Sequence, residues 1–448
     1  MRRVAKLICI LTAGCVPGLA LAGPTLTTIY TFTGGADGGS PGAGLVEGRH
    51  GVLYGTTEAG GAGAAGTVFQ LAPPRNGAGA YALTTLHSFA GGDDGADPTN
   101  IVADRYGNLY GVTSAGGGSS ACSGGCGTVF ALTPPAPGET NWSETVLHAF
   151  SGAADGRFPS GLAFDDDGNL YGFTWGGSGA CHAGCGTVYE LRRPRHGGSW
   201  QYATLYTFAN DADGHGPFGI PLIDRAGAIY GIAYSGGTGA ATPDACAPFV
   251  GCGEVFKLTP PDDDDSTSAT WTKSTLWAFD GANGTGAFNS LTMDEHGNLL
   301  GLTNEGGTSP ACPAVAGAYP AGCGTAFELD RPTSRGGAWS ERVIWNFTSD
   351  ADSAYPADSK LTPVAGGYVA STSGGSTDPI GLYGAIVEFV PPGHGRTAWT
   401  EKTLFTFAND ANGAVPVGVL LEADGAIYGT TYGYSGPAAA GTVFKLVP

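Results

Sequence analysis

Charged residues are scarce in this sequence. Asp, Glu, Lys and Arg make up only 13% of its 448 residues, about half of their usual share in globular domains. Lys, Glu and Arg are also residues that favour helices at protein surfaces. Their scarcity therefore excludes a helical bundle and a coiled coil. Beyond the N-terminal segment, no apolar run is long enough to span a membrane.

Positive charge and recognisable catalytic motifs are lacking as well. With 20 Lys and Arg against 39 Asp and Glu, the formal net charge is −19, which makes a nucleic-acid backbone an unfavourable partner. We find no nucleophile elbow, no HExxH motif, no phosphate-binding glycine loop and no nucleotide fingerprint. The sequence therefore contains none of the motifs that would identify those enzyme classes.

Glycine and aromatic residues are abundant instead. The chain has 79 Gly and 29 Pro, with 10% aromatic and 42% hydrophobic residues. This apolar content argues against disorder, and the composition does not match collagen. Glycine and proline suit turns, whereas β-branched and aromatic residues suit strands. The composition therefore predicts an all-β, turn-rich protein.

The N-terminus has the layout of a secretory signal peptide. Basic residues within the first six positions precede an apolar run over 7–22, and small residues stand at 20 and 22, just before Gly23. We therefore expect residues 1–22 to be a signal peptide and the mature protein to be secreted or periplasmic. A membrane anchor is the alternative, but the run is short and broken by Gly and Pro. Residues 12–15, Thr-Ala-Gly-Cys, leave lipoprotein attachment open.

A unit of about 61 residues repeats seven times along the mature chain. Its anchor is Leu53-Tyr54-Gly55-Thr56-Thr57, and equivalents stand at Tyr110, Tyr171, Tyr230, Leu300, Tyr368 and Tyr428. The third unit shows four β-type runs, over 161–165, 169–174, 186–191 and 203–208. All are short, rich in β-branched and aromatic residues, and bounded by Gly, Pro or Asp. Four antiparallel strands per repeat are typical of a β-propeller blade.

The two ends of the chain favour a closed ring over an open solenoid. Residues 26–32 form a fourth strand with no unit before it, and the last unit, over 417–446, lacks its fourth strand. We therefore predict a seven-bladed β-propeller of four-stranded antiparallel blades, closed by pairing of the N-terminal strand with the last blade. It forms a single domain over 23–448, with blades at about 43–89, 99–150, 160–208, 219–279, 289–347, 359–407 and 417–448 plus 26–32.

This unit resembles the GloVer tandem repeat, first noticed in Gloeobacter and Verrucomicrobia. The matching pieces include Gly107-Asn108-Leu109-Tyr110-Gly111, Gly127-Thr128-Val129-Phe130 and Thr145-Val146-Leu147-His148-Ala149-Phe150. Unit 6 departs most, with Gly367-Tyr368-Val369-Ala370 where Asn-Leu-Tyr-Gly is expected. The resemblance implies an exported protein but no known reaction or catalytic residue. The anchor typical of the family is absent, which favours a soluble exported form.

Ten cysteines less two in the signal peptide leave eight, and they form pairs in loops between second and third strands. The pairs are Cys122 with Cys126, Cys181 with Cys185, Cys246 with Cys252, and Cys312 with Cys323. In an oxidising compartment we expect four local disulfides. A zinc site made from two C-x₃-C pairs is the alternative, but the pairs belong to separate blades and thiolate ligands are disfavoured there.

Aspartate recurs in two kinds of loop. In the turn between first and second strands it recurs as Asp104, Asp167, Asp224, Asp294 and Asp424, where we expect it to stabilise the turn. The loops between fourth and first strands also carry Asp and Gly, as in 210–214. We expect Asx-type turns there and no cofactor. Calcium is the alternative, with Asp211 and Asp213 as candidate ligands.

Residues that break the repeat on the face of the disulfide loops form the candidate site. They are Arg157, Trp175, His182, His215, Tyr234, Glu305, Tyr432 and Tyr434. The other tryptophans recur before or within fourth strands, as packing residues do; they are Trp142, Trp200, Trp271, Trp277, Trp339, Trp345 and Trp399. Aromatic side chains beside polar groups suit sugars, through stacking and hydrogen bonds. The alternative is drift of exposed loops.

These observations favour an exported, non-catalytic propeller that binds a surface polymer (an extracellular glycan) or a partner protein. A carbohydrate-active enzyme, either a polysaccharide lyase or a glycoside hydrolase, is the alternative, because a sequence does not show whether acid and base groups share a pocket. The acidic charge favours a ligand that is neutral, cationic or bridged by a cation. We expect a monomer with no nucleic-acid partner and no membrane span.

Overall fold

The computed structural model describes most of the chain from Gly23 to Pro448. Outside the described residues lie 1–22, 76–78, 180, 182–183, 196, 210, 238–245, 247–250, 262–269, 313–320, 335, 350–353, 357–358, 375–382, 394–397, 422–423 and 434–437, together with the side chain of Asp211. The expected signal peptide, His182 and Tyr434 are therefore not among the residues described below.

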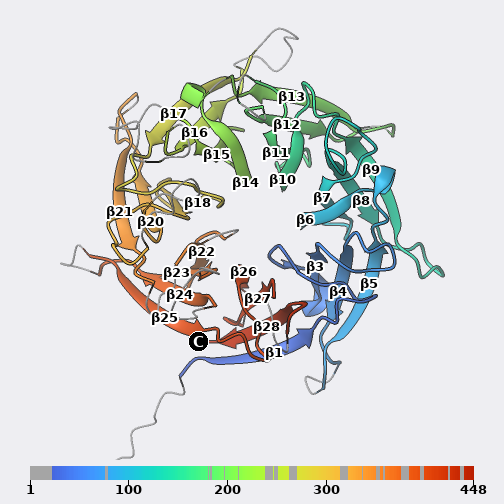
Figure 1. The fold of residues 1–448 in the computed structure, drawn as a ribbon. Helices are drawn as coiled ribbons and strands as arrows, with labels where there is room; N and C mark the ends of the chain where they lie inside the picture. Colours follow the sequence, from blue (N-terminus) through green and yellow to red (C-terminus); the bar gives the residue numbers. More distant parts are fainter. Residues whose placement is uncertain are drawn as a thin grey trace, which may run out of the picture.

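Seven antiparallel sheets of four strands each stand in a ring (Figure 1). Within the described residues, the helical segments are three single 3₁₀ turns, over 49–51, 92–94 and 211–213. No helix in this part of the chain has the length and apolarity that a membrane crossing requires. The predicted all-β propeller with seven blades is confirmed.

Each blade has four strands that follow one another from the centre of the ring outward. The innermost strands are β2 (Val46–Glu47), β6 (Ala96–Ala103), β10 (Arg157–Phe164), β14 (His215–Ile223), β18 (Thr292–Met293), β22 (Thr362–Val364) and β26 (Pro416–Leu421). The second strands are β3 (Leu53–Thr57), β7 (Leu109–Ala115), β11 (Leu170–Gly176), β15 (Ile229–Ser235), β19 (Leu299–Thr303), β23 (Gly367–Thr372) and β27 (Ile427–Thr431). The third strands are β4 (Thr67–Ala72), β8 (Thr128–Thr133), β12 (Thr187–Arg192), β16 (Glu254–Thr259), β20 (Thr325–Asp330), β24 (Ala385–Val390) and β28 (Thr442–Val447). The outermost strands are β5 (Ala82–Ser88), β9 (Ser143–Ala149), β13 (Gln201–Thr207), β17 (Thr272–Ala278), β21 (Ser340–Asn346), β25 (Thr400–Thr406) and, in blade 7, β1 (Thr25–Thr31).

The ring closes through the N-terminal strand, as predicted. β1 pairs antiparallel with β28, with Leu26 opposite Leu446 and Thr31 opposite Thr442. Just beyond the strand, the backbone N–H of Phe32 donates to the carbonyl of Gly441 at 3.0 Å. The first and last strands of the chain therefore share one sheet, and β28 is paired on both edges.

A ladder of aromatic pairs joins neighbouring blades. A phenylalanine that follows each outermost strand meets an aromatic residue of the third strand in the next blade, with ring centroids 5.1 to 6.0 Å apart. The pairs are Phe32–Phe69, Phe89–Phe130, Phe150–Tyr189, Phe208–Phe256, Phe279–Phe327, Phe347–Phe389 and Phe407–Phe444. All of these side chains are buried. The hydrophobic core therefore continues from blade to blade around the ring.

The glycine of the repeated anchor makes room for this ladder. A Cβ at Gly55 would lie 2.5 Å from the ring of Phe69, which faces it on the third strand. A larger residue therefore does not fit unless the aromatic ring is also replaced. Unit 6 has made both changes, because Ala370 takes the glycine position and the smaller Val387 faces it. The departure of unit 6 from the repeat is thus compensated within its own blade.

Candidate ligand-binding site

All second strands end on the same face of the ring, which also carries the disulfide loops and the loops between blades. We call it the loop face. In five blades a buried threonine at this end bonds to a threonine of the third strand at 2.8 to 2.9 Å. The pairs are Thr57–Thr67, Thr113–Thr128, Thr174–Thr187, Thr303–Thr325 and Thr431–Thr442. In every blade, the residue that follows this second-strand position, whether or not the position is a threonine, occupies what we call the rim position. The rim residues are Glu58, Ser114, Trp175, Tyr234, Asn304, Ser373 and Tyr432.

A residue with left-handed backbone stands at the entry to each innermost strand. Its φ lies between 53° and 64°, and the residues are Ser40, Asp97, Phe158, Gly216, Gly286, Tyr355 and Val415. Three of their N–H groups donate to a cysteine carbonyl of the preceding blade: Phe158 to Cys126 at 2.9 Å, Gly216 to Cys185 at 3.0 Å, and Tyr355 to Cys323 at 3.0 Å. The disulfide loop of one blade therefore holds the innermost strand of the next.

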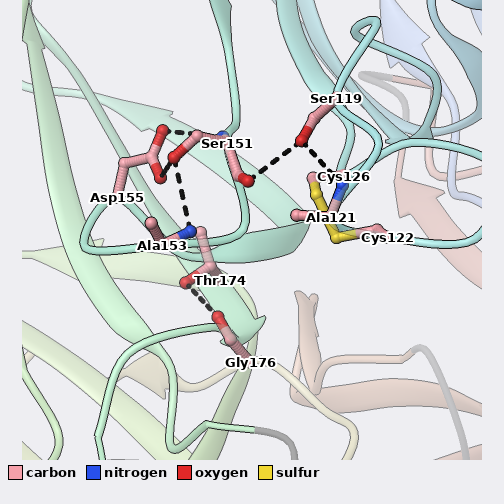
Figure 2. Close-up of a disulfide and its surroundings, with 9 residues drawn as sticks. All are labelled: Ser119, Ala121, Cys122, Cys126, Ser151, Ala153, Asp155, Thr174 and Gly176. Carbon is pink, nitrogen blue, oxygen red and sulfur yellow. Dashed lines mark hydrogen bonds between the residues drawn. A yellow bond between two sulfur atoms is a disulfide. The ribbon is translucent and has the colours of Figure 1, made fainter.

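All four predicted local disulfides are present, and the zinc alternative is wrong. Figure 2 shows the bridge between Cys122 and Cys126 beside Ser119. The hydroxyl of Ser119 donates to the carbonyl of Ser151, in the loop that leads to blade 3, at 3.0 Å. A Cβ at Gly152 in that loop would lie 2.8 Å from the Cys126 sulfur. The bridge thus packs directly against the loop between two blades.

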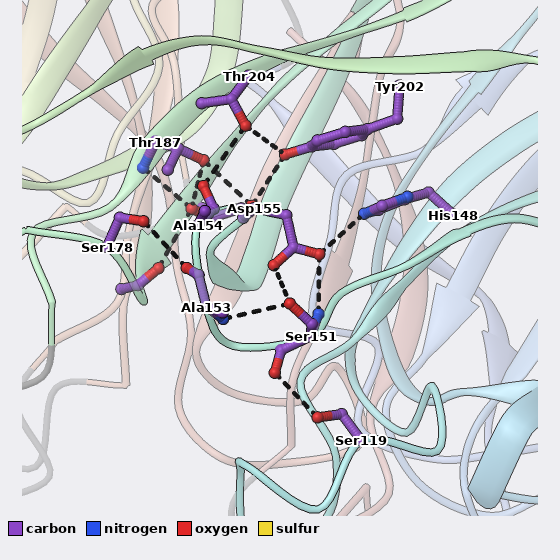
Figure 3. A network of polar contacts seen from close by, with 12 residues as sticks. Ser119, His148, Ser151, Ala153, Ala154, Asp155, Ser178, Thr187, Tyr202 and Thr204 are labelled. Atoms are coloured by element: carbon purple, nitrogen blue, oxygen red, sulfur yellow. Dashed lines mark hydrogen bonds and ion pairs between the residues drawn. The ribbon is translucent and has the colours of Figure 1, made fainter.

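The Asp-Gly loops between blades are held by their own carboxylates, but in four of them the carboxylate accepts an N–H four residues earlier, not two residues later as the expected Asx-type turn requires. The forward Asx bond is made by Asp280 and Asp410 in two other loops. In Figure 3, Asp155 accepts from the backbone N–H of Ser151 at 2.9 Å and lies 3.2 Å from Nε2 of His148. The carbonyl of Asp155 accepts from the hydroxyl of Tyr202 at 2.9 Å. Asp37, Asp94 and Asp213 make bonds equivalent to those of the Asp155 carboxylate in their own loops. The recurrence of this aspartate is therefore architectural.

The candidate calcium ligand Asp213 is engaged by protein donors. Its carboxylate accepts from the hydroxyl of Tyr206 at 2.9 Å and lies 3.3 Å from Nζ of Lys273. Lys273 also pairs at 2.5 Å with Glu254, a fully buried residue that replaces a threonine of the recurring pair. Among the described residues, no three His, Cys, Asp or Glu side chains are placed to hold a metal ion. The side chain of Asp211 lies outside that part of the chain.

In one turn between first and second strands, the register differs from the one expected. Asp165, not Asp167, closes the turn of blade 3, because its carboxylate accepts the N–H groups of Asp167 at 3.0 Å and Asn169 at 2.8 Å. Asp104, Asp224 and Asp294 accept the equivalent N–H groups in their own blades. Asp424 stands two residues nearer its second strand and accepts the N–H of Ala426 at 2.9 Å. Three consecutive aspartates at 165–167 conceal the register in the sequence.

Blades 3, 4 and 5 bring five aromatic side chains together. The ring of Trp175 stacks on Phe288, with centroids 5.3 Å apart and 23° between the planes, and lies 5.1 Å from Tyr234. Tyr234 and Phe288 are 4.2 Å apart. Phe218 meets Trp175 and Phe288 edge to face at 6.0 and 5.2 Å, and His215 lies 5.9 Å from Trp175. We call these five residues the aromatic cluster.

Three members of the aromatic cluster were predicted, whereas Phe218 and Phe288 were missed. Each stands two residues after the left-handed residue at the entry to an innermost strand. Blades 2 and 3 carry Thr99 and Ser160 at that position. A comparison of all units at that position would have revealed two phenylalanines in consecutive blades. The ring of Trp175 packs directly on the backbone of Gly216, where a Cβ would lie 2.9 Å from the ring.

Glu305 lies beside the aromatic cluster in blade 5. A Cβ at Gly286 would lie 2.1 Å from Oε2 of Glu305 and 3.3 Å from the ring of Tyr234, so the carboxyl and the ring border the same space. Glu305 is only 4% exposed, and its Oε2 has no hydrogen-bond partner among the described residues. Burial raises the pKa of this carboxyl to about 7. An unpartnered buried oxygen costs free energy, which a hydrogen bond from a ligand would recover.

Arg157 and His215 occupy equivalent positions at the start of β10 and β14. Arg157 lies opposite Gly176, the residue after Trp175, and its guanidinium stands 5.1 Å from the ring centroid of Phe158. Nδ1 of His215 lies 3.3 Å from the hydroxyl of Ser235. His215 therefore shares β14 with Phe218, and Arg157 lies in β10, next to the strand β11 that carries Trp175.

Tyr432 lies apart from this cluster. It is the rim residue of blade 7, and its hydroxyl donates to Oε2 of Glu58 in blade 1 at 3.0 Å. Burial raises the pKa of Glu58 above its usual value. In Figure 1, β27 lies across the ring from β15, which carries Tyr234. The predicted site residues thus fall into two groups on the loop face.

Comparison with solved structures finds propellers of similar fold at low identity. A putative glucose dehydrogenase from Thermus thermophilus is 13% identical, with a TM-score of 0.44, over 95% of this chain and 100% of its own. The PQQ domain of pyranose dehydrogenase from Coprinopsis cinerea is 10% identical, with a TM-score of 0.45, over 96% of each chain. The periplasmic gluconolactonase of Pseudomonas aeruginosa is 13% identical, with a TM-score of 0.47, over 86% of this chain and 95% of its own. These similarities concern the fold alone.

A known repeat family matches the sequence. The search of curated proteins found no match, but a family model for the Gloeobacter/Verrucomicrobia repeat matches residues 11–136 and 118–373. These segments cover most of the chain and include the motifs on which the resemblance rested. The chain therefore belongs to the Gloeobacter/Verrucomicrobia repeat family.

Proposed function

We propose that this protein is an exported, non-catalytic propeller that binds a glycan at the aromatic cluster of blades 3, 4 and 5. The observation that carries the proposal is the buried Glu305, whose unpartnered Oε2 borders the same space as the ring of Tyr234. Trp175 and Tyr234 occupy rim positions that are Ser114 and Asn304 in flanking blades. These two aromatic residues are therefore not required by the repeat.

A neutral sugar suits these groups. Aromatic rings pack against the apolar faces of sugar rings, and a few polar groups fix the hydroxyls. With a pKa of about 7, Glu305 is partly protonated near neutral pH, so it can both donate to and accept from hydroxyl groups. Export is supported by the four disulfides. They also stiffen the loops beside the cluster, and a preorganised site loses less entropy on binding.

The test is a glycan array followed by calorimetry on the glycan retained. We expect Trp175→Ala to weaken binding by about 1–2 kcal/mol, which is about 5- to 30-fold, on the scale of aromatic contacts. Because Trp175 packs against four neighbours, circular dichroism should confirm that the variant is folded. Tyr432→Ala is the matched control, since it removes a rim aromatic across the ring. Absence of any retained glycan, or equal weakening in both variants, would contradict the proposal.

A carbohydrate-active enzyme, a polysaccharide lyase or glycoside hydrolase, is the second candidate. Glu305 favours it, because a buried carboxyl with a pKa of about 7 has the property of a general acid. Incubation with acidic and neutral polysaccharides, with analysis of the products, distinguishes the two candidates. Product release by the wild type that Glu305→Gln abolishes without weakening binding would establish catalysis. Binding without product supports the non-catalytic role.

A further inference from the structure

The face opposite the loop face carries an unusual group of basic residues. Strands within a blade are antiparallel, so this face holds the turns between first and second strands and between third and fourth strands. Arg49 lies in the turn between β2 and β3, Arg105 and Tyr106 lie in the turn between β6 and β7, and Arg193 follows β12. We call these four residues the arginine patch; it extends over blades 1, 2 and 3.

Direct contacts tie the arginine patch together across blade boundaries. Nη2 of Arg49 donates to the carbonyl of Arg105 at 3.1 Å, and Nη2 of Arg105 donates to the hydroxyl of Tyr106 at 2.7 Å. The guanidinium carbons of Arg105 and Arg193 lie 4.8 and 5.6 Å from the ring centroid of Tyr106. Tyr106 is nevertheless 56% exposed. Two guanidinium groups therefore flank one solvent-exposed aromatic ring, and a third is bonded to the turn that carries it.

These guanidinium groups are not neutralised. Within the described residues, no carboxylate forms an ion pair with Arg49, Arg105 or Arg193, whereas several other basic residues are paired. The paired ones are Arg192 with Glu190, Arg342 with Glu328, Lys402 with Glu388, and Lys445 with Asp424. The turn carboxylate Asp104, next to Arg105 in the chain, is already bonded to the N–H groups of its own turn. The patch is thus a cationic surface without ion pairs on an acidic chain.

We propose that the arginine patch binds an anionic polysaccharide through carboxylate or sulfate groups on its sugars. Guanidinium groups bind such oxyanions with two parallel hydrogen bonds, and the exposed ring of Tyr106 suits the apolar face of a sugar. The net charge of −19 repels any polyanion at longer range, so binding depends on the contacts made at the patch itself. The exposed ring of Tyr106 favours a polymer with accessible sugar faces over duplex DNA. This site lies on the opposite face from the aromatic cluster and does not depend on the function proposed there.

Two carboxylates at the edge of the patch sharpen the test. Asp166 and Asp167 are exposed in the turn of blade 3, and a Cβ at the adjoining Gly168 would lie 3.2 Å from Nη1 of Arg193. Their negative charge should oppose an anionic ligand. Substitution of Asp166 and Asp167 by Asn should therefore strengthen binding, the opposite of the effect of removing arginine.

The experiment is affinity electrophoresis of the mature protein in gels that contain polygalacturonate, dextran sulfate or neutral dextran. We expect retardation in one or both anionic gels and none in dextran, and a loss of retardation as salt rises. The two anionic gels distinguish carboxylate from sulfate recognition. The R49Q/R105Q/R193Q variant should lose at least about tenfold in affinity, as expected for the loss of charge-assisted hydrogen bonds, and D166N/D167N should gain. Tyr106→Ala provides a second, uncharged test of the patch.

The control is R342Q/K402Q, which removes two basic residues that are ion-paired in blades 5 and 6. Equal loss in this control, retardation in neutral dextran, absence of retardation in both anionic gels, or tighter binding of duplex DNA would overturn the proposal. Trp175→Ala should leave retardation unchanged. An experiment that contradicts glycan binding at the aromatic cluster can therefore be told apart from one that contradicts anion binding at the arginine patch. Melting curves of each variant show whether a loss of binding reflects unfolding.

Discussion

At the scale of single residues, the aromatic cluster depends on glycine where the other blades do not. Ser40, Asp97 and Phe158 adopt a positive φ of 53°, 54° and 56° at the entry to their innermost strands, so this backbone conformation alone does not demand glycine. At Gly216 the φ is 64°, and the ring of Trp175 fills the place of a side chain. Glycine is therefore required there by the neighbouring ring.

The first prediction concerns Gly216→Ala. The new methyl group would lie 2.9 to 3.1 Å from three carbons of the Trp175 ring, so the ring must shift. We expect a loss of about 1–3 kcal/mol in the free energy of unfolding, as overpacking in a core costs, together with a change in tryptophan fluorescence. Urea denaturation measures the first and emission spectra the second. Gly92→Ala is the control, since its φ is 58° and nothing lies within 4 Å of its Cβ position; equal losses would contradict this explanation.

At the scale of elements, the blade interface is a pairing of one small and one large residue. The glycine of the second strand accepts the aromatic ring of the third, and that ring meets the phenylalanine that follows the preceding blade's outermost strand. Blade 6 shows that the pair can change together, because Ala370 faces Val387. The anchor position is thus glycine because of the ring that faces it, so the stability effects of substitutions at the two positions should depend on each other.

The second prediction is a double-mutant cycle at Gly55 and Phe69. Gly55→Ala alone should cost about 2–3 kcal/mol, because its methyl group overlaps the ring. Phe69→Val alone should cost about 1–3 kcal/mol, because it leaves a cavity beside Phe32. The double variant reproduces the natural pair of blade 6 and should lose at least about 1 kcal/mol less than the sum. Strictly additive losses in urea denaturation would show that the two positions are independent.

The repeat explains why the fold could be predicted and parts of the site could not. Strand number, ring closure and disulfide pairing follow from patterns that recur in several units, so each unit supports the others. Phe218 and Phe288 occur at a position where only two neighbouring blades are aromatic, and their contact depends on the closure of the ring. Tyr432 shares a rim position with Trp175, and the predicted blade boundaries already put the two residues four blades apart along the chain, so their grouping in one site was avoidable.

At the scale of the whole molecule, two blade interfaces place acidic groups close together. The second residue of the outermost strand faces the aspartate-containing loop of the preceding blade. In blade 4 this residue is Lys273, which pairs with Asp213. In blades 2 and 5 it is Glu144 and Glu341, which are repelled by Asp94 and Asp280 in addition to being partly buried. Burial is the larger cause and this repulsion the smaller one, and together they raise the pKa of both carboxyls to about 7.

The last prediction is that the protein is less stable at pH 8 than at pH 5. Glu144, Glu305 and Glu341 have pKa values of about 7 in the folded state against 4.5 as the reference for the unfolded chain. Between these values the folded protein binds more protons, so the stabilisation present below pH 4.5 is lost as the pH rises through 7. The lowered pKa of His148 opposes this trend within the same range, because the folded protein binds fewer protons at that site, but it is one group against three. The lowered pKa values of Asp37 and Asp424 act below about pH 4, outside this range.

Urea denaturation between pH 5 and pH 8 measures the effect. In the E144Q/E305Q/E341Q variant we expect a flatter pH dependence and a gain at pH 8 of the order of 1–3 kcal/mol at Glu305, and a smaller gain at Glu144 and Glu341, whose charges solvent partly screens. Glutamine keeps the shape of the carboxyl and cannot ionise, so the comparison isolates the charge. Glu139→Gln serves as the control, because Glu139 is exposed in a turn between strands. A wild-type stability that rises with pH, or an unchanged slope in the triple variant, would show that these interfaces do not set the pH response of the ring.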